Sequence, residues 1–229
     1  MSHVVHPFSH RLGIIRNWRS RWFGTKGAYI NSLRGDIVIR EFLEKRLRGY
    51  FVGNVDIERE EKAIKVIIET SRPGMVIGRK GEGSTKLKKE LLSLLKKKKL
   101  IDNEDLKIDI QEIKSPESNA SVVAQMIAEG LERRLPFRRA VKQTMEKVMA
   151  NRDVKGVKIL VSGRLGGADM ARKEKMKQGR IPLQTFRADI DFARFEARLP
   201  YGTIGIQVWI YKGEVFENQI NPGSLSRKM

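Results

Sequence analysis

The feature that most constrains the fold is a short basic loop that interrupts two helical segments. It consists of Gly78, Arg79, Lys80 and Gly81. Pro73 is well placed to start a helix before the loop, and the short apolar run 75–77 ends at Gly78. A longer helix is predicted just after Gly81. Its leucines recur every three or four residues, and most of its other positions are lysine.

Two glycines flanking two basic residues suit the binding of a phosphate backbone. Glycine lets the main chain approach phosphates without a Cβ atom in the way. The helix that follows presents free N–H groups and the positive end of its dipole, and Arg79 and Lys80 add charge. The alternative interpretation is a simple turn between helices, because Gly-x-x-Gly is a frequent pattern.

The predicted elements around the loop have a definite order. They are a helix over 28–49 with a break near Gly35, strands over 51–59 and 63–70, the two helices flanking the loop, and a strand over 106–110 after a turn at 102–103. This order, with Ile77 before the loop, resembles the KH module in its bacterial, type II form. The resemblance implies single-stranded RNA as the ligand of the loop.

A second domain is predicted to begin at the turn formed by residues 115–118. We expect one helix that ends near Arg134, another that starts near Pro136, and three strands over 157–161, 185–197 and 205–211, of which the last two form an antiparallel hairpin. The predicted class is α+β, an α/β sandwich with two helices on a mainly antiparallel sheet. The predicted bounds are a basic N-terminal extension 1–26, a KH domain 27–114, a C-terminal domain 115–215 and a tail 216–229. The extension shows no sustained period, and we expect it to order only against RNA.

The charge of the chain predicts a polyanionic partner. Lysine and arginine number 46 against 27 acids, giving a net charge of +19 and a pI near 10.3. Nucleic acid is favoured over a membrane, because no apolar run reaches the about 18 to 20 residues of a membrane span. The sequence shows no signal peptide and contains no cysteine, so we expect a cytoplasmic location.

A second basic group lies in the C-terminal domain. It consists of Arg133, Arg134, Arg138, Arg139 and Lys142. The spacing places the last three on the outward side of one helix, and no acid lies between Arg133 and Lys142. A solvated helix face normally interleaves acids, so the pattern favours RNA contact over the plain solvated face that is its alternative.

A third basic group follows the first predicted strand of this domain. The glycine-rich stretch 162–167 contains Arg164, and Arg172 and Lys173 come next, followed by Lys175, Lys177 and Arg180. These residues are expected to cradle phosphates, and a tight turn with an exposed basic loop is a compatible interpretation. The run Lys86 to Lys99 is either a solvated face that steers RNA or a direct contact.

Catalytic interpretations fail on the residues present. The glycine spacing of a P-loop occurs over 78–83, but Ser84 stands where the lysine is required. The histidines all lie in the N-terminal extension without an evident fourth metal ligand. Asp189 and Asp191 are explained by ion pairing with nearby arginines. We therefore expect no enzyme activity, no metal and no cofactor.

Several stretches together resemble a known family, that of the third protein of the small ribosomal subunit in its bacterial form. They are 11–14, 72–74, 76–81, 137–140, 162–168, 182–183, 187–191, 201–202 and 208–210. The resemblance implies a structural constituent of the small-subunit head that binds small-subunit rRNA and lines the entrance to the mRNA channel. It associates Arg138, Arg139 and Lys142 with mRNA positioning and with unwinding of structured mRNA without ATP. It also implies the tenth and fourteenth small-subunit proteins as neighbours. A free KH-type regulator of mRNA is the alternative function.

Overall fold

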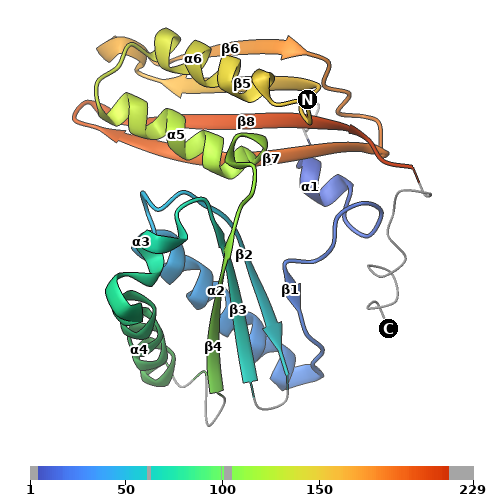
Figure 1. The fold of residues 1–229 in the computed structure, drawn as a ribbon, viewed down its shortest axis with the longest axis vertical. Helices are drawn as coiled ribbons and strands as arrows, with labels where there is room; N and C mark the ends of the chain where they lie inside the picture. The colour runs from blue at the N-terminus through green and yellow to red at the C-terminus, as the bar shows by residue number, and fades with distance from the viewer. Residues whose placement is uncertain (1–4, 61–62, 99, 101–104, 217–229) are drawn as a thin grey trace. The chain divides into compact units, whose positions relative to one another are not determined.

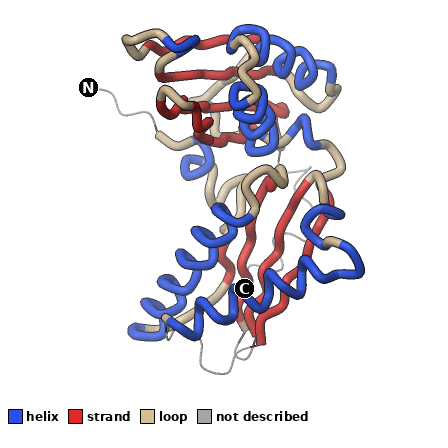
Figure 2. Tube along the Cα trace, turned by 90° about the vertical axis from the view of Figure 1, so that its left-hand side faces the viewer, coloured by secondary structure: helices blue, strands red, loops and turns tan. Residues whose placement is uncertain are grey.

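The chain forms two separate units in the computed structural model, which describes residues 5–60, 63–98, 100 and 105–216. One unit comprises residues 18–116, and the other combines residues up to 17 with those from 117 onward. Helices and strands occur in both, as Figures 1 and 2 show, so the predicted α+β class is confirmed. The predicted tail 216–229 lies outside the described residues except for Phe216, and so does the turn at 102–103.

The first unit is built on a four-stranded sheet in the order β1-β2-β3-β4. The strands are β1 (Ser20–Arg21), β2 (Val52–Arg59), β3 (Ala63–Thr70) and β4 (Asp105–Glu112). The pair β2 and β3 is antiparallel, as the hairpin prediction requires, and β4 runs parallel to β3. A parallel neighbour needs a crossover connection, which the helices between β3 and β4 supply.

Three helices and one turn of 3-10 helix complete this unit. They are α2 (Lys26–Arg46), α3 (Pro73–Ile77), η1 (Arg79–Gly81) and α4 (Glu82–Lys97). Alternate residues of β3, namely Ile64, Val66 and Ile68, are fully buried against Leu91 of α4 and Leu43 of α2. All helices therefore pack on one face of the sheet, and the basic loop lies between α3 and α4.

Helix α2 is continuous through Gly35, so the predicted break there is wrong. A Cβ atom at Gly35 would lie 2.5 Å from a guanidinium nitrogen of Arg59. Arg59 bonds the buried carboxylate of Asp36 at 2.8 Å, and Trp22 Nε1 donates to the same carboxylate at 2.7 Å. The glycine thus makes room for a buried ion pair and does not end the helix.

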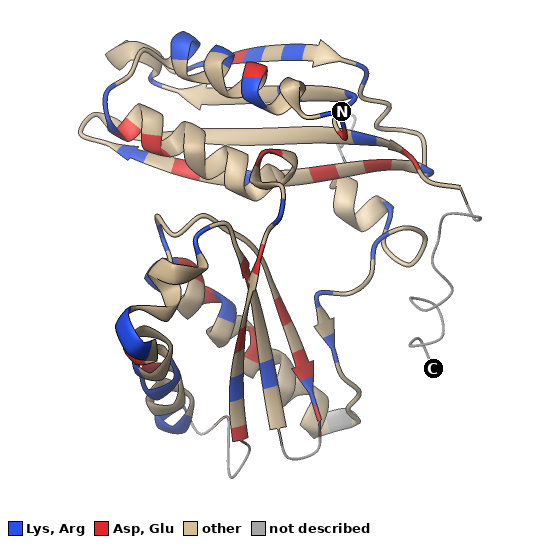
Figure 3. Ribbon diagram, in the orientation of Figure 1, with Lys and Arg blue, Asp and Glu red and all other residues tan. Residues whose placement is uncertain are grey.

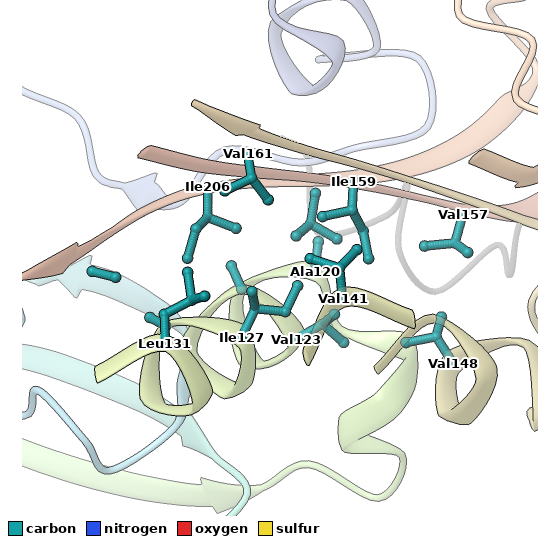
Figure 4. Packing of buried hydrophobic residues seen from close by; sticks show 14 of the residues in the cluster. Ala120, Val123, Ile127, Leu131, Val141, Val148, Val157, Ile159, Val161 and Ile206 are labelled. Atoms are coloured by element: carbon teal, nitrogen blue, oxygen red, sulfur yellow. The ribbon is translucent and has the colours of Figure 1, made fainter. Parts of the chain in front are cut away.

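The second unit contains a four-stranded antiparallel sheet in the order β6-β5-β8-β7. Its strands are β5 (Gly156–Gly163), β6 (Arg172–Gly179), β7 (Ala188–Leu199) and β8 (Gly202–Glu214), and its short 3-10 turns are η2 (Pro116–Ser118) and η3 (Leu165–Gly167). Helices α5 (Ala120–Glu132) and α6 (Phe137–Ala150) cover one face. Figure 4 shows Ile127 of α5 and Val141 of α6 directed toward Ile159 of β5 and Ile206 of β8.

The prediction of three strands in this unit is wrong, because residues expected to form a basic loop make the edge strand β6. Its hydrogen bonds to β5 extend over the whole strand, from Gly156 opposite Gly179 to Gly163 opposite Arg172. The strand has few apolar residues, so the usual alternation of apolar and polar residues is weak. Charged residues are typical of edge strands, where they discourage pairing with another chain.

The expectation that the N-terminal extension orders only against RNA is also wrong for its described part. Helix α1 (Pro7–His10) lies against β7, and Arg11 beside it is fully buried. Arg11 Nε donates to the carbonyl oxygen of Ala188 at 2.5 Å, and Nη2 donates to those of Leu183 and Thr185 at 2.9 Å each. The partners lie more than 170 residues away in sequence, so no local pattern reveals them.

No helix among the described residues is long and apolar enough to cross a membrane.

Candidate RNA interface

The basic loop of the first unit has a backbone that requires glycine. Gly78 adopts φ 71° and ψ −176°, a conformation open essentially to glycine alone. Lys80 has φ 51° and ψ 21°, in the left-handed region, and Gly81 follows at φ 79°. These conformations separate α3 from α4 within four residues, and the side chains of Arg79 and Lys80 are exposed.

The loop is held tightly on its inner side by the start of α4. A Cβ atom at Gly83 would lie 2.6 Å from the carbonyl oxygen of Val76 and 2.8 Å from that of Ile77. The hydroxyls of Ser84 and Thr85 both donate to the carbonyl oxygen of Gly81, at 2.9 and 3.0 Å. No side chain caps the N-terminus of α4, although the N–H of its first residue, Glu82, donates to the carbonyl oxygen of Arg79. The positive end of the helix dipole still favours an anion such as a phosphate beside Arg79 and Lys80.

The second predicted group lies on α6 and on the turn before it. Helix α6 turns Ala140, Val141 and Val148 into the core and leaves Arg138, Arg139 and Lys142 exposed, as the spacing predicts. Among the described residues, Arg139 and Lys142 have no acidic partner within ion-pair distance. We call Arg138, Arg139 and Lys142 the α6 cations.

Acidic residues of other elements neutralise part of the positive charge of this second basic group. Arg138 bonds the carboxylate of Glu174 on β6 through both Nε and Nη2, at 3.3 and 3.2 Å. This hydrogen bond is the main cause that lowers the pKa of Glu174 and raises that of Arg138. Arg172 lies 3.5 Å from the same carboxylate, and Arg133 pairs with Glu129 one turn earlier on α5. Sequence inspection missed Glu174, because strand alternation in β6 is needed to direct it toward α6.

Arg134 occupies a special backbone position at the end of α5. Its φ of 62° is left-handed, its N–H bonds the carbonyl of Leu131, and the next N–H bonds that of Gly130. These two bonds form a Schellman motif, in which glycine is the usual residue at the left-handed position. Arg134 is nevertheless an arginine, and its side chain is exposed.

The third predicted group separates into residues with different surroundings. Arg164 is tied to its own loop, with Nε donating to the carbonyl of Ala168 at 2.9 Å and Nη2 bonding Asp169 at 3.0 Å. Arg172 lies near Glu174 and 5.8 Å from the ring centroid of Phe137, on the helix side of the sheet. Lys173 is exposed and pairs in register with Ser162. The structure thus brings Arg172 next to the α6 cations, whereas the side chain of Arg164 stabilises its own loop.

The fold and these surfaces define a class, that of KH-type RNA-binding proteins with an additional α+β domain. Residues 38–118 match the sequence model of the KH domain, and residues 127–210 match the model described as ribosomal protein S3, C-terminal domain. The chain belongs to the ribosomal protein S3 family.

Relatives named small ribosomal subunit protein uS3 match over nearly the whole chain. The protein of Caldicellulosiruptor saccharolyticus is 48% identical over 215 residues, which cover 94% of this chain and 94% of the relative. The protein of Clostridium novyi is 44% identical over 215 residues, again 94% of each chain. The protein of Chromobacterium violaceum is 43% identical over 231 residues, covering 100% of this chain and 96% of the relative.

Proposed function

We propose that this protein is a structural, non-enzymatic constituent of the small ribosomal subunit that binds small-subunit rRNA in the cytoplasm. Membership of the S3 family over both domains supports this proposal. The basic loop and the other basic groups are the predicted RNA contacts. Cosedimentation with the small subunit at moderate salt is the direct test. Recovery only in free fractions, with crosslinks spread over messages, would instead favour a free KH-type regulator.

The finer part of the proposal concerns the α6 cations. They line the entrance to the mRNA channel, position the mRNA and assist unwinding of its duplexes without ATP, beside the tenth and fourteenth small-subunit proteins. The observation that carries this is the outward display of Arg139 and Lys142 without an acidic partner among the described residues. Cations that bind the phosphates of separated strands shift the equilibrium of a duplex toward the open state. Translocation of the ribosome along the mRNA then drives the strands apart.

Replacing Arg138, Arg139 and Lys142 together with alanine tests this role. We expect ribosomes with this variant to slow several-fold at stable mRNA hairpins while small-subunit assembly and speed on unstructured mRNA are retained. A matched variant replaces Lys86, Lys89 and Lys97 of α4 with alanine and removes the same charge from another helix. Equal speed of the α6 variant on structured and unstructured messages would contradict the proposal.

A further inference from the structure

The sheet of the C-terminal unit has a second face that α5 and α6 do not cover. Helix α1 covers part of this face along β7, where His6 packs on Phe192, and leaves the side formed by β5 and β6 open. Val157, Ile159 and Val161 of β5 are buried against α5 and α6. Because side chains alternate along a strand, Lys158, Leu160 and Ser162 lie on the opposite face. The same alternation applies to the neighbouring strands, whose register with β5 is known.

The register places a set of cations on this second face. Lys158 lies opposite Lys177 on β6 and Trp209 on β8, and Leu160 lies opposite Lys175 and Gln207. Ser162 lies opposite Lys173, and Arg194 of β7 lies opposite Gln207. We call the resulting set the cationic sheet face; its members are Lys158, Lys173, Lys175, Lys177 and Arg194. Figure 3 shows the basic residues along β6.

The charge of this face is not balanced within the unit. Among the described residues, none of the five cations forms an ion pair with an acid. One acid, Glu196 of β7, lies on the same face, at the end of the sheet where Lys173 and Ser162 are paired. Lys158 and Lys177 are directly opposite each other, an arrangement that destabilises a sheet by like-charge repulsion. The sheet therefore carries an unfavourable charge pattern that a polyanionic partner would relieve.

The aromatic residues of this face point to the kind of nucleic acid. The Nζ of Lys158 lies 4.4 Å from the ring centroid of Trp209, and Arg194 lies 5.5 Å from that of Phe192. Both rings are more than nine-tenths buried, so they offer no platform on which an unpaired base could stack. Recognition here must depend on phosphates, which a double helix displays while its bases stay paired.

The shape of the face also suits a phosphate backbone. Lys173, Lys175 and Lys177 recur at every second residue, about 6.8 Å apart along β6. A regular row of ammonium groups can contact several phosphates of one strand. At the end of the face lies an open hollow of about 650 Å³, whose polar lining consists of Ser162, Arg172, Lys173, Glu196 and Thr203. Two cations and two hydroxyl donors thus outnumber the single carboxylate of the hollow, where a phosphate backbone would reach the face.

We propose that the cationic sheet face binds the phosphate backbone of double-helical RNA, independently of its sequence. This deepens the proposed function and rests on it, since it assigns a distinct duplex-binding surface to a protein of the small subunit. The C-terminal domain then presents cations on both sides of one sheet. The α6 cations contact the mRNA, and the cationic sheet face binds a double-helical segment of rRNA.

The full-length variant K173Q/K175Q/K177Q tests the inference with a blunt 20-base-pair RNA duplex as the probe. Loss of three phosphate contacts should weaken duplex binding at least about tenfold at moderate salt. It should also reduce the slope of log affinity against log salt by roughly 2 to 3. The unfolding temperature should not fall, because the three lysines are exposed on an edge strand and the variant removes the repulsion between Lys177 and Lys158.

The matched variant K65Q/K88Q/K107Q removes the same charge from the KH domain, where Lys65 and Lys88 already face Asp109 and Asp105. It should keep most of the duplex affinity. Equal losses in the two variants, or no loss in the β6 variant, would overturn the inference. If the β6 variant binds the duplex normally but no longer joins the small subunit, the face docks a protein and the inference is again overturned. Cosedimentation of the unmodified protein is a separate readout, so the proposed function can stand when the inference fails.

Discussion

At the scale of single residues, backbone strain coincides with the predicted RNA contacts. Among the described residues, three residues other than glycine have positive φ, and two of them are Lys80 and Arg134. A left-handed conformation costs a residue with a Cβ atom about 1 kcal/mol relative to glycine. Strained residues of this kind cluster at functional sites. Lys80 and Arg134 are basic, so we infer that RNA binding accounts for a lysine and an arginine where glycine would be less strained.

Arg134 allows this cost to be measured. We expect Arg134→Gly to raise the free energy of unfolding relative to Arg134→Ala by about 1 kcal/mol, because both remove the charge but only glycine relieves the strain. Urea unfolding of the two variants gives the difference. Both should bind RNA more weakly than the unmodified protein, and identical stabilities would show that no strain exists at this position.

At the scale of elements, β6 determines how the cations of the C-terminal domain are used. Its odd-numbered lysines face away from the helices, whereas Glu174 faces α6 and bonds Arg138 at 3.2 Å. One strand thus supplies cations to one side of the sheet and an acid to the other. Arg138 is in consequence partly neutralised, and Arg139 and Lys142 are the stronger candidates for contact with RNA.

The pKa of Glu174 provides a test of this arrangement. The hydrogen bond from Arg138 lowers the pKa of Glu174, so the pair stabilises the fold at neutral pH and is lost as pH falls through that lowered pKa. In Arg138→Gln, the carboxyl resonance of Glu174 should titrate at higher pH, nearer its ordinary value, as followed by NMR. Glu174→Gln should strengthen RNA binding about threefold at low salt by freeing Arg138, whereas Glu112→Gln on β4 should have little effect. An unchanged titration in Arg138→Gln would contradict the pairing.

At the scale of the whole molecule, the chain order and the folding units do not coincide. Residues up to 17 belong with the C-terminal unit, although the KH unit lies between them in sequence. Arg11 attaches the N-terminal segment to the C-terminal unit, because its guanidinium donates to carbonyl oxygens near the start of β7. Arg16 adds an ion pair with Asp189 at 2.6 Å. The C-terminal unit is therefore completed by the first segment of the chain.

Arg11→Ala should destabilise the C-terminal unit by about 3 kcal/mol, because it leaves several buried carbonyl oxygens without a donor. Hydrogen exchange should increase in β7 and β8 and remain unchanged in β2 and β3. Arg40→Ala is the counterpart in the KH unit, where Arg40 bonds the carbonyl oxygens of Val55 and Arg19. It should produce the opposite pattern, and matching patterns in the two variants would show that the units do not unfold separately.

The sequence by itself determined the elements whose signals are local. The glycines around Arg79 and Lys80, the leucine period of α4 and the alternation in β3 each depend on residues a few positions apart, and the predicted elements agree with the structure. The exposure of Arg138, Arg139 and Lys142 followed likewise from the helical period of the apolar residues in α6. The exact domain bounds 27–114 and 115–215 stay predictions.

Only the tertiary structure decided the features that join distant residues. The burial of Arg11 depends on carbonyls more than 170 residues away, and the pairing of Arg138 with Glu174 depends on the register of β6. Strand β6 itself forms because β5 offers a free edge, not because its own residues favour a strand. Long-range hydrogen bonds and ion pairs leave no period in the sequence, so the division of cations between the two sides of the C-terminal sheet emerges only when the strands are paired.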